Sequence, residues 1–153
     1  EFCAQAGTCL ALSTVDFNHP LVVSAGNFAL KCGAAFQLQD DILGVYGDAP
    51  KFGKPLGSDI CCGKKTLLMQ KTFEKCSVLE RDYIVSLNEN ETLTLEELNK
   101  VQEICQTCGA LEKINQIATD FVNEALKELT NFPTNLYTNL LTSWAEYVIA
   151  RKY

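Results

Sequence analysis

The sequence is poor in histidine and has no long uninterrupted apolar run. Its single histidine, His19, precedes Pro20 at the start of an expected helix, which favours a capping or loop role over catalysis. Catalytic triads and zinc sites that need histidine therefore have little to draw on. No window reaches the roughly 18 consecutive apolar residues of a membrane helix, and no charged segment leads into an apolar run at the start. We therefore expect neither a membrane span nor an export signal, and a cytoplasmic protein.

The net charge is negative but unevenly distributed. A formal charge of -6 argues against a nucleic-acid binder, because nonspecific affinity for phosphate backbones needs an excess of lysine and arginine. One stretch differs, since its only acidic residues are Asp59 and Glu74. Its lysines are Lys51, Lys54, Lys64, Lys65, Lys71 and Lys75. This stretch could hold a local anion site on an otherwise acidic protein.

The eight cysteines are scattered over helical patterns, in a chain long enough to form a core without disulfides. We expect all eight to be free thiols in a reducing compartment. Cys105 and Cys108 form a lone CxxC without the second pair or the histidines of a zinc site. Core packing is therefore favoured there over a redox pair or half of a zinc site.

Helical periodicity dominates and alternating strand patterns are nearly absent, which predicts an all-α fold. The expected helices cover approximately residues 2–12, 20–45, 66–87, 94–108, 111–130 and 135–150. Thr94 and Glu97 have the spacing of a capping box. A lysine- and glycine-rich loop occupies residues 47–65. In the last helix, the residues interpreted as core are Leu136, Leu140, Trp144, Tyr147 and Val148.

Two adjacent carboxylates lie in the otherwise apolar 20–45 helix. Residues spaced by three, four or seven project from one side of a helix. The set with this spacing is Gln37, Asp40, Asp41 and Gly44. Inward-facing carboxylates are costly to desolvate without a cation, and oxygen ligands suit magnesium, which takes one or two carboxylates plus phosphate oxygens. The alternative is an exposed acidic pair on a solvated face.

The loop that follows carries lysines on a glycine-rich backbone. Lys54 lies in the segment 53–59 (GKPLGSD), and Lys64 lies in the segment 63–66 (GKKT). Glycines let such a loop approach an anion closely, and lysines can neutralise the charge of a leaving diphosphate. With the carboxylates upstream, this predicts a magnesium-diphosphate site. The spacing of a nucleotide-binding P-loop is absent, and a solvated lysine-rich loop is the alternative.

Residues 36–44 (FQLQDDILG) resemble the second aspartate-rich motif of the trans-isoprenyl (polyprenyl) diphosphate synthases. The segments that resemble the rest of this signature, in register, are 46–48 (YGD), 53–59 (GKPLGSD) and 63–68 (GKKTLL). The resemblance covers essentially the whole chain. It implies that residues 1–153 are the C-terminal part of one polyprenyl synthase domain, the C-terminal half of an all-α isoprenoid-synthase-type bundle.

By this resemblance, Asp40 would bind one magnesium ion, with Asp41 supporting the site through water. Gln37 would contact substrate, while Lys54 and Lys64 would hold the allylic diphosphate. The implied reaction is ionisation of that diphosphate to an allylic cation, attack by the double bond of isopentenyl diphosphate, and loss of a proton. Family members are homodimers, so the resemblance also implies a homodimer for the intact enzyme.

The sequence departs from the family pattern in two respects. Many members have a third aspartate where this sequence has Gly44, although Asp48 follows one turn later. The family's first aspartate-rich motif, its Lys-Thr motif and the arginines of its isopentenyl site are expected upstream of Glu1. We therefore expect this chain to be inactive alone, and to expose apolar surface that the missing N-terminal half would cover.

Two other functions remain open at this point. A noncatalytic regulatory subunit of a heteromeric prenyl synthase would share the fold, but it has no physical need for intact metal ligands and lysines. A terpene cyclase would need an Asn/Asp, Ser/Thr and Glu triad, and Gly44 and Asp48 stand where Ser/Thr and Glu are required. An upstream DDxxD-type motif would favour the synthase over the regulatory subunit.

Overall fold

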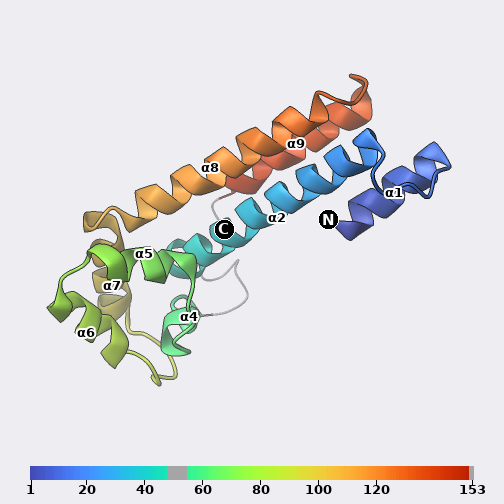
Figure 1. Cartoon of the computed structure of the whole chain (residues 1–153). Coiled ribbons are helices and arrows are strands. Elements are labelled where there is room, and N and C mark those ends of the chain that lie inside the picture. Colours follow the sequence, from blue (N-terminus) through green and yellow to red (C-terminus); the bar gives the residue numbers. More distant parts are fainter. Residues whose placement is uncertain (48–54, 152–153) are drawn as a thin grey trace. The chain divides into compact units, whose positions relative to one another are not determined.

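The computed structural model describes residues 1–47 and 55–151, and in this part of the chain all regular secondary structure is helical (Figure 1). The predicted all-α fold is confirmed. The helices are α1 (Phe2–Leu12), α2 (Pro20–Tyr46), α4 (Ser58–Cys61), α5 (Leu67–Lys75), α6 (Val78–Ser86), α7 (Leu95–Thr107), α8 (Ala110–Leu129) and α9 (Leu136–Ala150). They form two compact units, residues 1–37 with 117–151 and residues 38–116. Helices α2 and α8 each contribute residues to both units.

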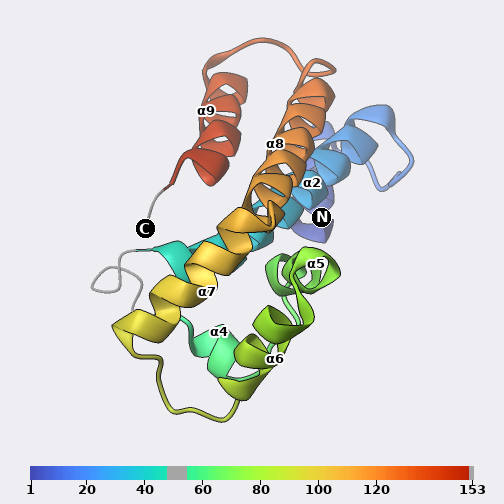
Figure 2. The same cartoon turned by 90° about the vertical axis from the view of Figure 1, so that its left-hand side faces the viewer.

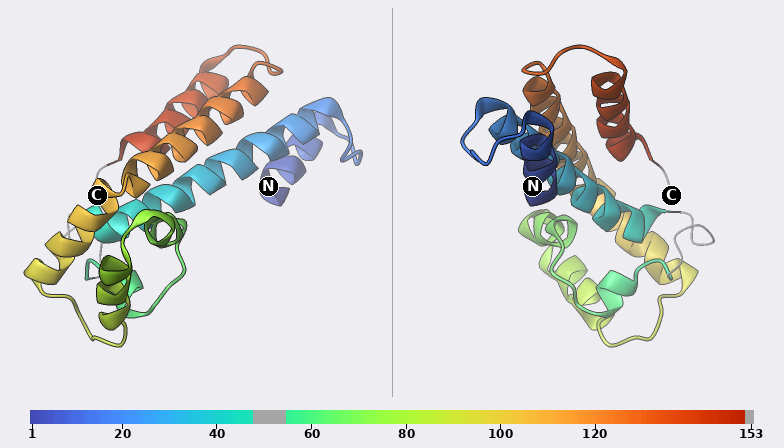
Figure 3. Two further views of the ribbon diagram at one scale, coloured as in Figure 1. Left: turned by 60° about the vertical axis from the view of Figure 1, so that its left-hand side comes forward. Right: turned by 90° about the vertical axis from the view of Figure 1, so that its right-hand side faces the viewer.

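In the first unit, α2 packs against α1 and α8. Gly26 on α2 permits the approach of α1, because a Cβ atom at this position would lie 2.8 Å from Cγ of Gln5. Lys31 on α2 pairs with Glu128 on α8, with 3.1 Å between Nζ and Oε1. Figure 3 shows α1 alongside the start of α2, and α9 running antiparallel to α8. The first unit is thus a set of helices arranged around α2.

The prediction for the core of the last helix is largely wrong. Only Val148 of the five predicted residues is buried, together with Ala145 three positions before it. The four exposed residues and their exposed fractions are Leu136 (68%), Leu140 (56%), Trp144 (46%) and Tyr147 (48%). Within the described residues, α9 therefore buries a narrow face, and most of its apolar side chains face solvent.

In the second unit, α5 packs against α7. Leu68 on α5 is fully buried, as are Val101 and Cys105 on α7. The Thr72 hydroxyl lies 2.9 Å from the carbonyl oxygen of Leu68 and 3.3 Å from Sγ of Cys105, so this buried polar group is satisfied. Figure 2 shows α4, α5, α6 and α7 of this unit.

The single helix predicted over 66–87 is wrong, because the structure divides this segment into α5 and α6. Cys76 has an extended backbone (ψ 161°) that ends α5. Ser77 then caps α6 in a capping box with Glu80. The Ser77-x-x-Glu80 spacing is a helix-start signal in the sequence, and in the structure this cap outweighs the apolar periodicity on which the prediction of one helix rested.

Other local predictions are confirmed. Thr94 and Glu97 form the expected capping box at the start of α7. The backbone N–H of Leu21 donates to Nδ1 of His19 (3.3 Å), so the single histidine has a capping role. All eight cysteines are free, and burial raises the pKa of the Cys32 and Cys105 thiols to about 11.

Helix α2 is long and apolar enough to cross a membrane by length and composition alone. In the structure, 44% of its most apolar window is buried against the rest of the protein. The expected absence of a membrane span therefore stays a prediction.

Candidate functional site

The C-terminal end of α2 carries the two predicted carboxylates. Asp41 is buried, with 7% of its surface exposed, and Asp40 is half-buried. Gln37, one turn earlier on the same helix, is exposed and is the last residue of the first unit. Since Asp41 lies in the interior of the second unit, the simple alternative of a solvent-exposed acidic pair is excluded for this carboxylate.

A lysine compensates the charge of the buried carboxylate. Nζ of Lys64 lies 3.3 Å from Oδ1 of Asp41 and 2.7 Å from Oδ2 of Asp59. The hydrogen bond to Asp59 is the largest cause of a raised pKa of the Lys64 ammonium; partial burial opposes this rise, and Asp41 adds to it. The Lys64 side chain is 46% exposed, so its ammonium can still reach a ligand from solvent.

The turn after the undescribed part of the loop fixes Asp59 next to α2. Gly57 has a φ of +78°, which favours glycine, and its N–H donates to the carbonyl oxygen of Gly44 (2.8 Å). This hydrogen bond connects the start of α4 to α2. The N–H of Lys64 donates to the carbonyl oxygen of Asp59 (2.8 Å), so backbone as well as side chain holds Lys64 beside Asp59.

Both flanking helices are anchored at the site. The Thr66 hydroxyl, immediately after the lysines, accepts from the N–H of Met69 (3.2 Å) and caps α5. At the end of α2, the Tyr46 hydroxyl donates to the carbonyl oxygen of Gln102 (2.8 Å), and Nε2 of Gln102 donates to the carbonyl oxygen of Val45 (2.7 Å). This reciprocal pair joins α2 to α7 and restrains the turn that carries Asp41.

We expect Gly57→Ala to destabilise the protein and loosen the Asp59 turn. A positive φ costs a non-glycine residue about 1–2 kcal/mol, and the new Cβ would lie 2.5 Å from Cδ1 of Leu93. Gly109→Ala is the matched control, because Gly109 also has a positive φ (+73°) but a Cβ atom there would meet nothing within 4 Å. Urea unfolding should show a larger loss of unfolding free energy for Gly57→Ala than for Gly109→Ala. Equal losses would mean that the Leu93 side chain moves aside without destabilising the protein.

Sequence reasoning did not assign Asp59 a role in the site. It is the nearest ionic partner of Lys64 in the described residues, and a Cβ at Gly44 would lie 3.8 Å from its Oδ2 atom. Position 44, where many members of the resembled family have a third aspartate and this chain has glycine, thus faces the Asp59 carboxylate. No local pattern reveals this contact, which joins two segments 15 residues apart. Lys54 and Asp48 lie outside the described residues.

The carboxylates of Asp40 and Asp41 fit a magnesium site whose other ligands come from outside the described part of this chain. Within residues 1–47 and 55–151, no group of three or more His, Cys, Asp or Glu side chains is arranged to hold a metal ion. Magnesium commonly takes only one or two protein carboxylates and completes its shell with phosphate oxygens and water. Asp40 and Asp41 offer carboxylates of this kind, and the neighbouring ammonium suits a phosphate.

Comparison with known sequences identifies a family model and several relatives of this chain. The Polyprenyl synthetase family model matches residues 2–106. The chain is 32% identical over 137 residues to a geranylgeranyl diphosphate synthase of Saccharolobus solfataricus, covering 88% of this chain and 41% of the relative. It is 34% identical over 123 residues to a short chain isoprenyl diphosphate synthase of Methanothermobacter thermautotrophicus, covering 79% and 37%. The chain thus spans about two fifths of the length of these relatives.

Solved structures of synthases of this kind are also similar to this chain. A geranylgeranyl pyrophosphate synthase from Corynebacterium glutamicum, complexed with isoprenyl diphosphate and magnesium, superposes with a TM-score of 0.78 at 26% identity, covering 86% of this chain and 38% of that one. A polyprenyl synthase from Caulobacter crescentus, complexed with calcium and isoprenyl diphosphate, gives 0.76 at 26% identity, covering 86% and 40%. The chain belongs to the polyprenyl synthetase family, the trans-isoprenyl diphosphate synthases.

Proposed function

We propose that this chain is the C-terminal part of a prenyltransferase of isoprenoid biosynthesis, which condenses an allylic diphosphate with isopentenyl diphosphate. The observation that carries the proposal is the half-exposed Lys64 ammonium, which lies 3.3 Å from the buried Asp41 in a member of this family. A cation beside metal-type carboxylates is the arrangement that a diphosphate leaving group requires.

A divalent metal is part of this proposal. Asp40 and Asp41 would hold it, because carboxylate oxygens are ligands that magnesium takes together with phosphate oxygens and water. Magnesium bound by Asp40 and Asp41 would neutralise phosphate oxygens and so assist departure of the diphosphate.

The chain's own residues have distinct roles in this proposal. Lys64 would exchange part of its contact with Asp59 for a phosphate oxygen, and Asp59 would hold the ammonium in position until then. Lys54 is proposed as a second diphosphate ligand and Gln37 as a substrate contact, both from the family resemblance. No covalent bond between enzyme and substrate is needed, since the allylic cation is captured directly by the double bond of isopentenyl diphosphate.

The remaining parts of the proposal concern the whole protein. Residues 1–153 would form the C-terminal part of one domain, which spans both compact units. An N-terminal half would supply the remaining metal ligands and the isopentenyl diphosphate site. The intact enzyme would be a cytoplasmic homodimer, and it is the homodimer that the family resemblance implies.

The test is a condensation assay with an allylic diphosphate and labelled isopentenyl diphosphate. A polypeptide that carries this chain together with an upstream half should form product, and chelation of magnesium should abolish it. The 153-residue chain alone should bind diphosphate weakly and turn over none. Diphosphate binding without turnover in the longer polypeptide would favour a regulatory subunit, and full activity of the chain alone would refute the need for a second half.

A further inference from the structure

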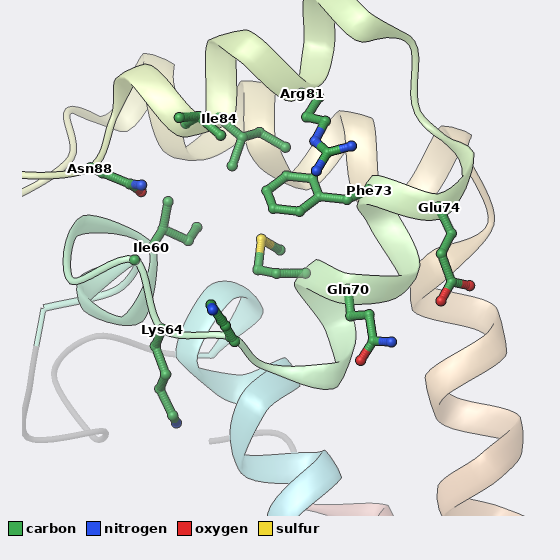
Figure 4. A pocket seen from close by; sticks show the side chains of 12 residues that line it. Ile60, Lys64, Gln70, Phe73, Glu74, Arg81, Ile84 and Asn88 are labelled. Atoms are coloured by element: carbon green, nitrogen blue, oxygen red, sulfur yellow. The ribbon is translucent and has the colours of Figure 1, made fainter.

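A cavity of about 470 Å³ lies in the second unit, on α4, α5, α6 and the turn before α5 (Figure 4). Neither Asp40 nor Asp41 contributes to its lining. The Lys64 side chain points away from Phe73 and Ile84 in Figure 4, in keeping with its ion pairs to Asp41 and Asp59. The volume is typical of small-molecule sites, which span about 300–1,000 Å³.

The interior of this cavity is apolar. Its most deeply buried side chains are Ile60, Met69 and Ile84, with exposed fractions of 3%, 6% and 2%. The half-buried Phe73 ring and the exposed Val85 extend this apolar lining. A hydrocarbon portion of a ligand would gain free energy from contact with such a surface.

Two cations at the edge of the cavity have no ionic partner in residues 1–47 and 55–151. These are Lys65 and Arg81. The guanidinium carbon of Arg81 lies 5.4 Å from the centroid of Phe73, which holds this cation against the apolar lining. The acidic lining residue, Glu74, already pairs with Lys71 (2.7 Å).

The neutral polar groups of the lining are the amides of Gln70 and Asn88. Their NH2 groups can donate to an anion and their carbonyl oxygens can accept from water or a cation, so these amides favour neither sign of ligand charge. The cavity therefore combines an apolar interior with a cationic edge whose single carboxylate is engaged elsewhere. This combination selects against ligands that are cationic and against ligands that are small and wholly polar.

We propose that this cavity binds a small amphiphilic anion, with its apolar body against Ile60, Met69 and Ile84 and its carboxylate or phosphate head group on Lys65 and Arg81. This binding site adjoins the proposed prenyl-transfer site, with which it shares the lining residue Lys64, but it includes neither Asp40 nor Asp41 and the proposal does not depend on prenyl transfer. Planar guanidinium groups pair well with either kind of head group, so both belong to the proposed ligand class.

The single methionine of the chain offers a direct probe. With ¹³C-methyl methionine, the Met69 methyl group gives one resonance that reports on the interior of the cavity. Octanoate, octyl phosphate, octylamine and inorganic phosphate are the four probes. Octanoate or octyl phosphate should shift this resonance saturably, and whichever binds more tightly identifies the preferred head group. Octylamine and inorganic phosphate should not shift it at millimolar concentration.

Variants at the cationic edge complete the test. Lys65→Gln and Arg81→Gln should each weaken binding of the anionic probe about fivefold, as expected for loss of a partly exposed charge contact. Lys100→Gln is the matched control, because Lys100 is an exposed lysine paired with Glu103 and does not line the cavity. No shift with either anionic probe, an equal shift with octylamine, or unchanged affinity in both edge variants would refute the proposal.

Discussion

Asp40→Asn should reduce the rate of magnesium-dependent prenyl transfer by about 10²–10³-fold in a polypeptide that also carries the upstream half, the loss typical when one electrostatic contact to a developing charge is removed. Asp40 is half-buried at the end of α2, within reach of solvent and hence of a metal-bound diphosphate. Asparagine keeps the size and the helix but removes the negative charge. The measurement is kcat with saturating substrates at several magnesium concentrations.

A carboxylate outside the proposed site provides the control for this result, and Asp41 provides a comparison within the site. Glu103→Gln removes a carboxylate that pairs with Lys100 on the exposed surface of α7, so activity should stay at the parent level. Asp41→Asn should also lower activity, both because a proposed metal carboxylate is lost and because Lys64 would keep only one of its two carboxylate partners, Asp59. Unchanged kcat and unchanged magnesium dependence in Asp40→Asn would remove this carboxylate from the catalytic site.

Local signals in the sequence were sufficient to predict most helices. Pro20 begins α2, as expected for a residue whose missing N–H costs nothing in the first turn. The Thr94 capping box and the left-handed Gly109 mark the two ends of α7. In each case, the residues that decide the boundary lie within a few positions of it, so one sequence is enough to identify them.

The wrong predictions have a common physical cause, because apolar periodicity does not show what covers a helix face. The apolar residues from Leu136 to Tyr147 have helical spacing, yet burial of α9 in the described chain is limited to the face of Ala145 and Val148. The 66–87 segment is periodic on both sides of Ser77, and the cap there outweighs the periodicity. Tertiary packing determines which face of α9 is buried, and capping determines where α6 begins.

The candidate site was only partly accessible to sequence reasoning. The carboxylates on α2 and the role of Lys64 as a cation were predicted from spacing and composition, and the structure brings Asp41 and Lys64 together. The pairing of Lys64 with Asp59 was missed, because it depends on the turn at Gly57 and its hydrogen bond to Gly44. Contacts of this kind are set by backbone conformation, which residue spacing does not reveal.

Leu68→Ala should cost about 2–5 kcal/mol of unfolding free energy, the range found when a fully buried leucine is truncated in a packed core. Leu68 lies in the first turn of α5, four residues after Lys64, and has no exposed surface. Its burial in the second unit holds the start of α5, which carries the capping Thr66. Loss of this packing should also loosen Lys64 and reduce diphosphate binding.

Two matched variants show whether the loss of stability comes from the buried position of Leu68 and from the volume removed there. Leu79→Ala removes the same atoms from α6 at a position that is 82% exposed, so its effect should stay within about 0.5 kcal/mol. Leu68→Met keeps most of the volume and should cost less than about 1.5 kcal/mol. The measurement is urea unfolding, followed by hydrogen exchange in residues 38–116, because two compact units need not unfold in one step. Equal losses for Leu68→Ala and Leu79→Ala would mean that the start of α5 is not held by the burial of Leu68, and that the position of Lys64 depends instead on its ion pair with Asp59.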